Sequence, residues 1–307
     1  GGPVVTDLAM QLGPVRLGSP LIAAAGTVGS VVEFTDVIDF SAYGAAVAKS
    51  VAPEPWPGRP APRIAPVGTG MLNGIGIQNP GVTSWIAEIE PQLDQVETDV
   101  WASAVAHDVA GFATVAGELE GASVPAIEIN LSCANLVGVP FALDDAMAGE
   151  IFAQVRDTTA KPIGAKLSAD AQPVVAVAEA VADAGADWIV MGNTVMGAAI
   201  DVGTRRPLLS GMSGGYSGEP IRPIMIKSVL DISHALPDMP IVGCGGVSTA
   251  AHALEYVLAG ACAVALGTAH FRSPRVASKI LKGMDAYLVE HGFSSLEDLK
   301  GAYEPWS

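Results

Sequence analysis

A cysteine between two amide side chains is the feature of this sequence best suited to chemistry. The stretch Asn130-Leu-Ser-Cys-Ala-Asn135 places Cys133 at the end of an apolar run. A lone cysteine in an apolar chain is usually an inert core residue, but this one has polar neighbours on both sides. Asn130 and Asn135 each offer a donor and an acceptor. We therefore expect this segment to bind a planar ligand with amide or carboxylate edges.

Further amides and two lysines follow other apolar runs. Asn73 lies in the stretch from Gly70 to Asn79, and Asn193 precedes Thr194. Lys49 and Lys166 each lie inside a strand-like apolar run, where an unpaired ammonium is costly to bury. We therefore predict that these lysines have electrostatic roles inside the protein. The alternative is that their side chains extend to the rim of the fold.

Two glycine-containing pairs late in the chain predict a phosphate site. Gly245-Gly246 and Gly267-Thr268 each follow an apolar run. Glycine lets backbone N–H groups approach phosphate oxygens that a side chain would hold away. The alternative is that these glycines only make turns. Because the loops after the last two strands of a (β/α)8 barrel commonly bind phosphate, the two pairs together favour the phosphate site.

The elements that must position these residues alternate between strands and helices. Helical periodicity is found over residues 83–96, 170–184 and 248–259, whereas residues 51–81 and 203–219 are rich in Pro or Gly and are expected to form inserted active-site loops. We predict a single-domain α/β fold, a (β/α)8 TIM barrel over residues 1–307, with a doubly wound sheet as the competitor. The predicted strands are Pro20–Ala25, Ala45–Ser50, Val100–Ala106, Ala126–Leu131, Pro162–Leu167, Asp187–Gly192, Pro240–Cys244 and Ala263–Gly267.

Composition excludes several classes of protein. The chain has 16 Lys and Arg against 32 Asp and Glu, for a net charge of -16, which disfavours nucleic acid and anionic membrane surfaces as partners. Its 3 cysteines have no metal-ligand spacing, so we expect no disulfide scaffold, metal site or iron–sulfur cluster. Cys244 and Cys262 lie in apolar runs and are expected to be core residues. The expected location is the cytoplasm.

These motifs together resemble the class 1 dihydroorotate dehydrogenases over nearly the whole chain. The segment Gly197–Pro207 is similar to the B type of that class. The resemblance rests on Ala24-Ala-Gly-Thr27, Ala48-Lys-Ser50, the stretch Met71–Gly81, Asn130-Leu-Ser-Cys133, Ala165-Lys-Leu167, Gly192-Asn-Thr194, Gly214-Gly-Tyr-Ser-Gly218, Gly243-Cys-Gly-Gly246 and Gly267-Thr268.

The resemblance implies an FMN barrel that oxidises dihydroorotate to orotate. Cys133 would be the base that removes the proton from C5, with Lys49 beside flavin and substrate, and Lys166 against the N1/O2 edge of the flavin. The implied substrate-binding residues are Asn73, Asn130, Asn135, Asn193 and Thr194. The implied cofactor-binding residues are Ala25, Gly26, Lys49, Ser50, Asn130, Lys166, Gly218, Gly245, Gly246, Gly267 and Thr268.

The B type also implies protein partners. Electrons would pass to NAD through a separate subunit carrying FAD and an iron–sulfur cluster, because this chain lacks the cysteines for a cluster. A homodimer core is expected. With fumarate or another small acceptor instead, no such subunit is needed.

Three residues depart from the family pattern, and other functions stay open. Ala25, Ala134 and Tyr216 stand where the family usually has Ser, Pro and Leu. A flavin enzyme acting on another dihydropyrimidine or cyclic amide is one alternative, and a flavoprotein without turnover is a second. The non-redox alternative is a phosphate-binding barrel lyase or isomerase with Lys166 as Schiff-base former.

Overall fold

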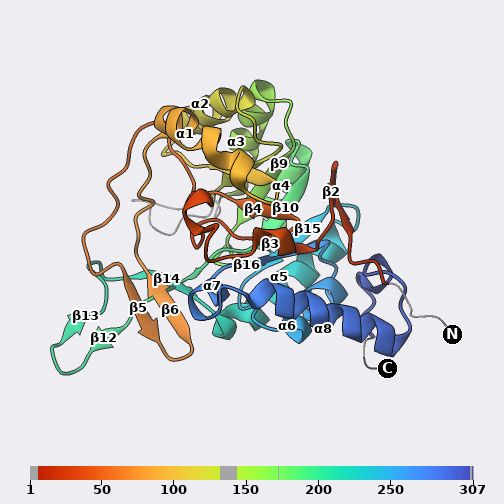
Figure 1. The fold of residues 1–307 in the computed structure, drawn as a ribbon. Helices are drawn as coiled ribbons and strands as arrows, with labels where there is room; N and C mark the ends of the chain where they lie inside the picture. The colour runs from red at the N-terminus through yellow and green to blue at the C-terminus, as the bar shows by residue number, and fades with distance from the viewer. Residues whose placement is uncertain (1–5, 132–143, 172, 305, 307) are drawn as a thin grey trace.

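Eight parallel strands close into a barrel at the centre of the molecule (Figure 1). The computed structural model describes residues 6–131, 144–171, 173–304 and 306. All eight predicted strands are confirmed, and closure of the barrel excludes the doubly wound sheet. In their order around the barrel, which is also chain order, the strands are β3 (Leu21–Ala23), β4 (Ala45–Val47), β7 (Val100–Ala104), β8 (Ile127–Asn130), β9 (Ile163–Leu167), β10 (Trp188–Met191), β15 (Ile241–Cys244) and β16 (Ala263–Leu266).

The barrel strands are buried on both faces, which explains why their sequences are apolar without alternation. Successive side chains of a strand still point to opposite sides. In β8, Ile127 and Ile129 pack outward against the helices, whereas Ala126, just before the strand, belongs to the cluster inside the barrel. The same alternation turns Glu128 and Asn130 toward the barrel interior.

Helices cover the outside of the barrel (Figure 1). The predicted helix over 248–259 is confirmed, with Thr249 accepting a hydrogen bond from His252 N at its start. The helix predicted from 170 begins only after Pro173. The longer helices are α1 (Val82–Glu88), α2 (Val109–Glu120), α3 (Asp145–Thr158), α4 (Val174–Asp183), α5 (Arg222–Ala235), α6 (Ala250–Leu258) and α8 (Val276–His291).

Short helical turns complete the outer layer. The helix predicted over 83–96 is wrong in extent, since α1 ends at Glu88 and a 3-10 helix follows over Glu90–Gln95. Pro91 lacks an N–H, and its ring conflicts with a continuing α-helix. Within the described residues no helix is long and apolar enough to cross a bilayer. The short elements are α7 (Ala269–Arg272), η1 (Val32–Phe34), η2 (Phe40–Ala42), η3 (Glu90–Gln95), η5 (Glu219–Ile221) and η6 (Glu297–Leu299).

An antiparallel sheet, here called the arm, projects from one side of the barrel (Figure 1). The two segments predicted as inserted loops, 51–81 and 203–219, are insertions between barrel elements, and both contribute strands to this sheet. Its central pairing joins Asn73 to Gly215, residues too distant in sequence for a local pattern to reveal. The arm contains β5 (Ile64–Val67), β6 (Gly70–Asn73), β11 (Val195–Gly197) and β14 (Gly214–Ser217), and a hairpin of β12 (Ile200–Asp201) and β13 (Arg206–Pro207) lies between β11 and β14 in the chain.

Apolar side chains fill the end of the barrel where the strands begin. The hairpin of β1 (Met10–Leu12) and β2 (Val15–Leu17) contributes Leu12 and Leu17 to the interior cluster. Trp101 and Trp188 belong to the same cluster, with ring centroids 5.1 Å apart. Because this end is filled, a ligand has room only at the opposite end, where the strands finish.

The packing of Trp188 against β9 leaves no room for a side chain at Gly164, and a substitution there tests this packing. A Cβ there would lie 2.1 Å from Trp188 Nε1, and Trp188 is fully buried. Gly164→Ala should therefore lower the free energy of unfolding by roughly 1–3 kcal/mol through overpacking. The matched control is Gly117→Ala on the exposed face of α2, where the nearest atom is 3.7 Å away. It should raise stability by about 0.5–1 kcal/mol. Equal urea denaturation curves for the two variants would contradict this packing.

Candidate active site

One pocket at the carboxyl ends of the barrel strands gathers the predicted site residues. It has a volume of about 270 Å³, roughly twenty times the ~10–15 Å³ that one water requires. Cys133 and Asn135 lie outside the described residues. Every other predicted site residue lines the pocket, namely Ala25, Gly26, Lys49, Ser50, Asn73, Asn130, Lys166, Asn193, Thr194, Gly218, Gly245, Gly246, Gly267 and Thr268. The pocket thus combines residues from barrel strands, their following loops and the arm.

The loops after β15 and β16 line one end of the pocket with backbone. Gly245 and Gly246 have φ values of +132° and +72°, which side chains rarely adopt. A Cβ on Gly246 would lie 3.0 Å from the carbonyl oxygen of Gly218. In the neighbouring loop, Thr268 donates a hydrogen bond to Ser217 Oγ at 2.8 Å. This glycine-lined end matches the cradle that a phosphate group needs.

A buried ion pair lies inside the barrel, beneath the pocket. Lys166 Nζ is 3.3 Å from Glu128 Oε1, and the two side chains are only 6% and 4% exposed. The register of β8 and β9 pairs Asn130 with Lys166, so Glu128 lies one layer deeper than either. Sequence reasoning identified Lys166 but missed Glu128. The signal was available, since Glu128 precedes Asn130 by two residues and must share its face of the strand.

Hydrogen bonds orient the amide side chains around the pocket. Asn130 Nδ2 donates to Ser50 Oγ at 3.1 Å, and Ser50 is in turn 2.9 Å from Ser103 Oγ. On the arm, Asn73 Nδ2 donates to the carbonyl oxygen of Gly215 at 3.2 Å. Asn193 Oδ1 accepts from the backbone N of Thr194. These bonds fix which edge of each amide faces the pocket.

Cys244 packs against the core cluster inside the barrel, as expected, but it is not only a core residue. Its side chain lines the pocket, close enough to Lys166 and Glu128 for both charges to act on it. Burial raises the pKa of the Cys244 thiol, while the Lys166 charge opposes that rise. Cys262 is 3% exposed, and its place in the core is confirmed. Among the described residues, no three His, Cys, Asp or Glu side chains are grouped to hold a metal ion.

A buried histidine ties the loop after β3 to α7. Thr27 Oγ1 donates to the carbonyl oxygen of Ala24 and lies 3.1 Å from His270 Nδ1, while Tyr43 Oη lies 2.8 Å from His270 Nε2. Both bonds fit a neutral ring that donates from Nδ1 and accepts at Nε2. Burial lowers the pKa of His270 to about 4, which keeps the ring neutral near pH 7. Thr27 lines the pocket, so this anchor holds part of its wall.

Charged side chains surround the outer part of the glycine-lined end. Glu219 accepts a short hydrogen bond from Ser248 Oγ, and this bond lowers the pKa of the carboxyl. The charges of His252, Arg272 and Arg222 act in the same direction, against the effect of burial. Glu219 and Arg272 both line the pocket, and neither was predicted as a site residue. No motif in the sequence marked them.

Comparison with known proteins gives a single family. A family model described as dihydroorotate dehydrogenase matches residues 7–288. A Pelobacter propionicus protein named dihydroorotate dehydrogenase B (NAD(+)), catalytic subunit, is 41% identical over 97% of this chain and 99% of its own length. Proteins of the same name from Alkaliphilus metalliredigens and a Geobacter species are 36% and 38% identical, over 96% and 97% of this chain and 98% of their own lengths.

The buried ion pair predicts a non-additive pair of substitutions. Glu128→Leu leaves a buried ammonium without this carboxylate, and Lys166→Met leaves a buried carboxylate without its cation. Each should cost about 3–5 kcal/mol of unfolding free energy, because one buried charge loses the opposite charge of this pair. The double variant removes both charges and should lose less than either single variant. Urea denaturation of all four proteins tests this, and additive losses would contradict the pairing.

His270 predicts a pH dependence of stability. Its pKa in the folded protein, about 4, lies below the ~6.5 of an unfolded histidine, so the unfolded chain binds a proton first as pH falls. Its contribution is present above pH ~6.5 and is lost as pH falls toward 4, by up to about 3 kcal/mol. His270→Gln should remove this component. Unfolding free energies at pH 7, 6, 5 and 4 measure it, and a constant difference between wild type and variant would contradict it.

Proposed function

The chain belongs to the dihydroorotate dehydrogenase family, and from that premise we propose that it oxidises dihydroorotate to orotate with bound FMN, as a step of pyrimidine synthesis. The main support is that one pocket collects a glycine-lined end, a buried lysine and several oriented amides. These are the features needed for the phosphate, the ring and the polar substrate of such a reaction.

The residues of the pocket fit FMN. The backbone of Gly245, Gly246 and Gly267 would hold the ribityl phosphate, with Gly218 and Thr268 beside it. Lys166 would place a fixed positive charge at the flavin ring and stabilise the negative charge that reduction adds. The other side chains for the ring are those of Ala25, Lys49, Ser50 and Asn130, with Gly26 supplying backbone. Bound FMN would accept the hydride from C6 of the substrate.

Cys133 and the amides would act on the substrate. In the proposal, Cys133 removes the proton from C5, which requires its thiolate form or help from a second base. Asn73, Asn130 and Asn193 surround the pocket and would bind the carboxylate and ring amides, together with Asn135 and Thr194. Lys49 lines the same pocket and would lie beside both flavin and substrate.

We further propose the B-type electron route. The relatives named above are catalytic subunits of NAD(+)-linked enzymes, which supports a partner subunit with FAD and an iron–sulfur cluster for this chain. A homodimer core in the cytoplasm belongs to the same proposal. The segment between β11 and β14, which includes the β12–β13 hairpin, offers exposed apolar side chains for a second copy, with Ile200, Val202 and Met212 exposed at 65%, 89% and 79%.

Anaerobic titration of the purified protein tests the reaction. Dihydroorotate should bleach the flavin absorbance near 450 nm, whereas dihydrouracil, which lacks the carboxylate, should not. Cys133→Ala should keep bound FMN but lose bleaching by at least a hundredfold in rate, since general base catalysis contributes about 10²–10⁴. A colourless protein would instead favour the non-redox lyase or isomerase.

Acceptors added after bleaching separate the two electron routes. In the B-type route, NAD alone should restore the absorbance slowly and fumarate should not restore it. Rapid reoxidation by fumarate would contradict that route while leaving dihydroorotate oxidation intact.

A further inference from the structure

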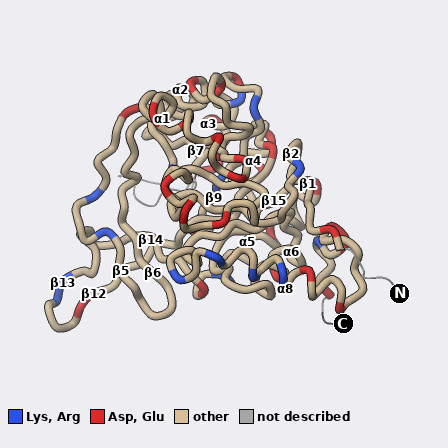
Figure 2. Tube along the Cα trace, in the orientation of Figure 1, with Lys and Arg blue, Asp and Glu red and all other residues tan. Residues whose placement is uncertain are grey.

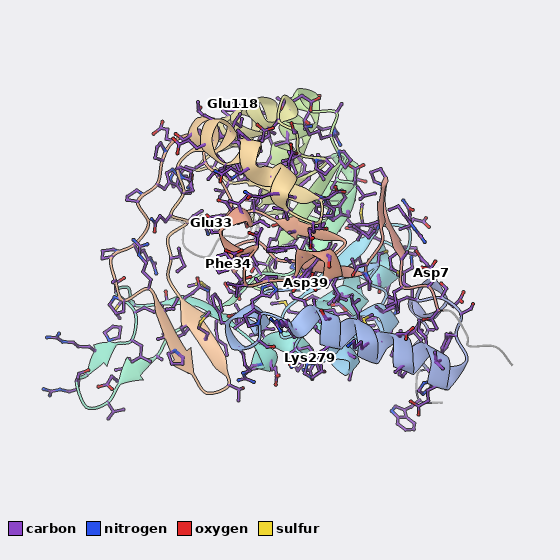
Figure 3. The ribbon with its side chains drawn as sticks, viewed as in Figure 1. Asp7, Glu33, Phe34, Asp39, Glu118 and Lys279 are labelled. Carbon is purple, nitrogen blue, oxygen red and sulfur yellow. The ribbon has the colours of Figure 1, made fainter. Side chains whose placement is uncertain are left out.

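Among its charged residues, this protein buries a single acid and a single base. All 32 Asp and Glu and all 16 Lys and Arg belong to the parts of the chain that the structure describes. Of these, Glu128 and Lys166 are the two that are buried. Figure 2 shows the other charged residues mainly along the outer helices and the connecting segments, and Figure 3 shows two of them, Glu118 on α2 and Lys279 on α8. The barrel interior thus holds one pair of opposite charges.

The register of two neighbouring strands brings these charges together. β8 and β9 pair Asn130 with Lys166 and, two residues earlier, Glu128 with Gly164. Lys166 therefore lies level with the pocket, which it lines, and Glu128 lies one layer beneath it. Glu128 Oε1 is 3.3 Å from Lys166 Nζ. The carboxylate thus supports the ammonium from the side away from the pocket.

An aromatic floor leaves Glu128 with this one ionic partner. The ring of Trp188 fills the space over Gly164, where a Cβ would lie 2.1 Å from Trp188 Nε1, and Gly164 is the strand neighbour of Glu128. Within the described chain, no Lys, Arg or His nitrogen besides Lys166 Nζ lies within 4.0 Å of the Glu128 carboxylate. In such poorly polarisable surroundings the attraction between the two charges is strong.

The other titratable side chains of the pocket near Lys166 do not replace Glu128. Cys244 of β15 lies close enough for both charges of the pair to act on its thiol. Burial raises the pKa of this thiol, so it carries no negative charge near pH 7. Lys49 lines the same pocket and can only disfavour a second positive charge. Among the described residues, the counter-charge of Lys166 therefore comes from Glu128.

A buried lysine without a counter-charge tends to become neutral. Burial can lower the pKa of a lysine from roughly 10.4 by up to about 3–5 pH units. A neutral amine would offer no positive charge to a ligand in the pocket. The role proposed above for Lys166 at the flavin therefore requires a group that holds its proton in place before and after the flavin is reduced.

We infer that Glu128 is a positioning residue that keeps Lys166 protonated in both oxidation states of the bound flavin. The inference rests on the proposed flavin reaction. The hydride from the substrate brings two electrons and one proton, and the negative charge that it adds meets a positive charge already present at Lys166. Without Glu128, Lys166 would be neutral before reduction and would take a second proton from water as the flavin is reduced. Glu128 thus sets how many protons accompany the two electrons.

The number of protons taken up on reduction tests this role. The FMN-loaded protein is reduced anaerobically with xanthine and xanthine oxidase beside a reference dye, so the measurement needs no dihydroorotate. The pH dependence of the midpoint potential between pH 7.5 and 9 then gives the protons per two electrons. We expect one proton in the wild type and two in Glu128→Gln, which keeps the shape of the side chain but removes its charge.

Two further variants separate charge from shape and from net charge. Glu128→Asp keeps a carboxylate at this position and should restore the single proton. Asp231→Asn breaks the surface pair of Asp231 with Lys227 on α5 and changes the net charge by the same amount as Glu128→Gln. Because this pair is exposed and neither residue lines the pocket, Asp231→Asn should keep the wild-type value of one proton.

Carbon-13 NMR of lysine labelled at Cε reads the proton on Lys166 directly, with Lys166→Met to identify its signal. In the wild type the amine should stay charged up to pH 9, with or without FMN. In Glu128→Gln its titration should move down by about two pH units or more. Since this measurement also works without flavin, it does not depend on the proposed reaction.

Several results would overturn the inference. They are a single proton in Glu128→Gln, two protons in the wild type, in Glu128→Asp or in Asp231→Asn, and a Lys166 titration that Glu128→Gln leaves unchanged. If Glu128→Gln does not fold, the wild type and Glu128→Asp still decide the question by their proton number and Lys166 titration. A colourless protein, or a flavin that dihydroorotate does not bleach, would instead overturn the proposed function, and the NMR titration would still decide the role of Glu128.

Discussion

The barrel interior is apolar where the strands begin and charged where they end, and the site depends on this division. Trp101, Trp188 and the leucines of the β1–β2 hairpin exclude polar groups from one end. One layer above them, the Lys166 ammonium can remain in the interior because Glu128 lies 3.3 Å away. A buried ammonium is tolerated only with such compensation. The packed end therefore leaves room for a ligand at the other end, where Lys166 is the member of the ion pair that lines the pocket.

The buried ion pair provides a fixed charge and contributes little stability. A buried ion pair adds little to the free energy of folding, since desolvation offsets most of the attraction, and apolar residues of similar size would often do as well. In the proposed reaction its value would lie in the pocket, where a preoriented charge would stabilise a developing anion without reorganisation. The same environment acts on Cys244. Burial disfavours ionisation of its thiol, and the nearby charge of Lys166 opposes that effect.

The sequence predicted the barrel strands and most of the described site, because both depend on local patterns. Apolar runs mark strands buried on both faces, and glycine pairs after such runs mark backbone that must approach a ligand. The arm was missed since its pairing joins Asn73 to Gly215 across the chain, and no local period encodes that contact. Glu128 was missed for a different reason. Its spacing from Asn130 places both on one face of the strand, but the ion pair that allows its burial depends on Lys166 of the neighbouring strand. The helix predicted over 83–96 was too long, because α-helical hydrogen bonding cannot continue through Pro91.

Charge distribution links the inside of the pocket to its surroundings. A chain of net charge -16 repels anions at long range. The proposed phosphorylated cofactor would therefore be attracted locally by backbone N–H groups and by Lys166, which is buried and so shielded from solvent ions. The cations of α7 and α8, Arg272, Arg275, Lys279 and Lys282, are exposed and are therefore screened within about 8 Å at physiological ionic strength. Binding of an anion inside the pocket should for this reason depend weakly on salt, whereas attraction of an anion to this exposed surface should depend on it strongly. The different screening of the two sets of cations follows from their burial.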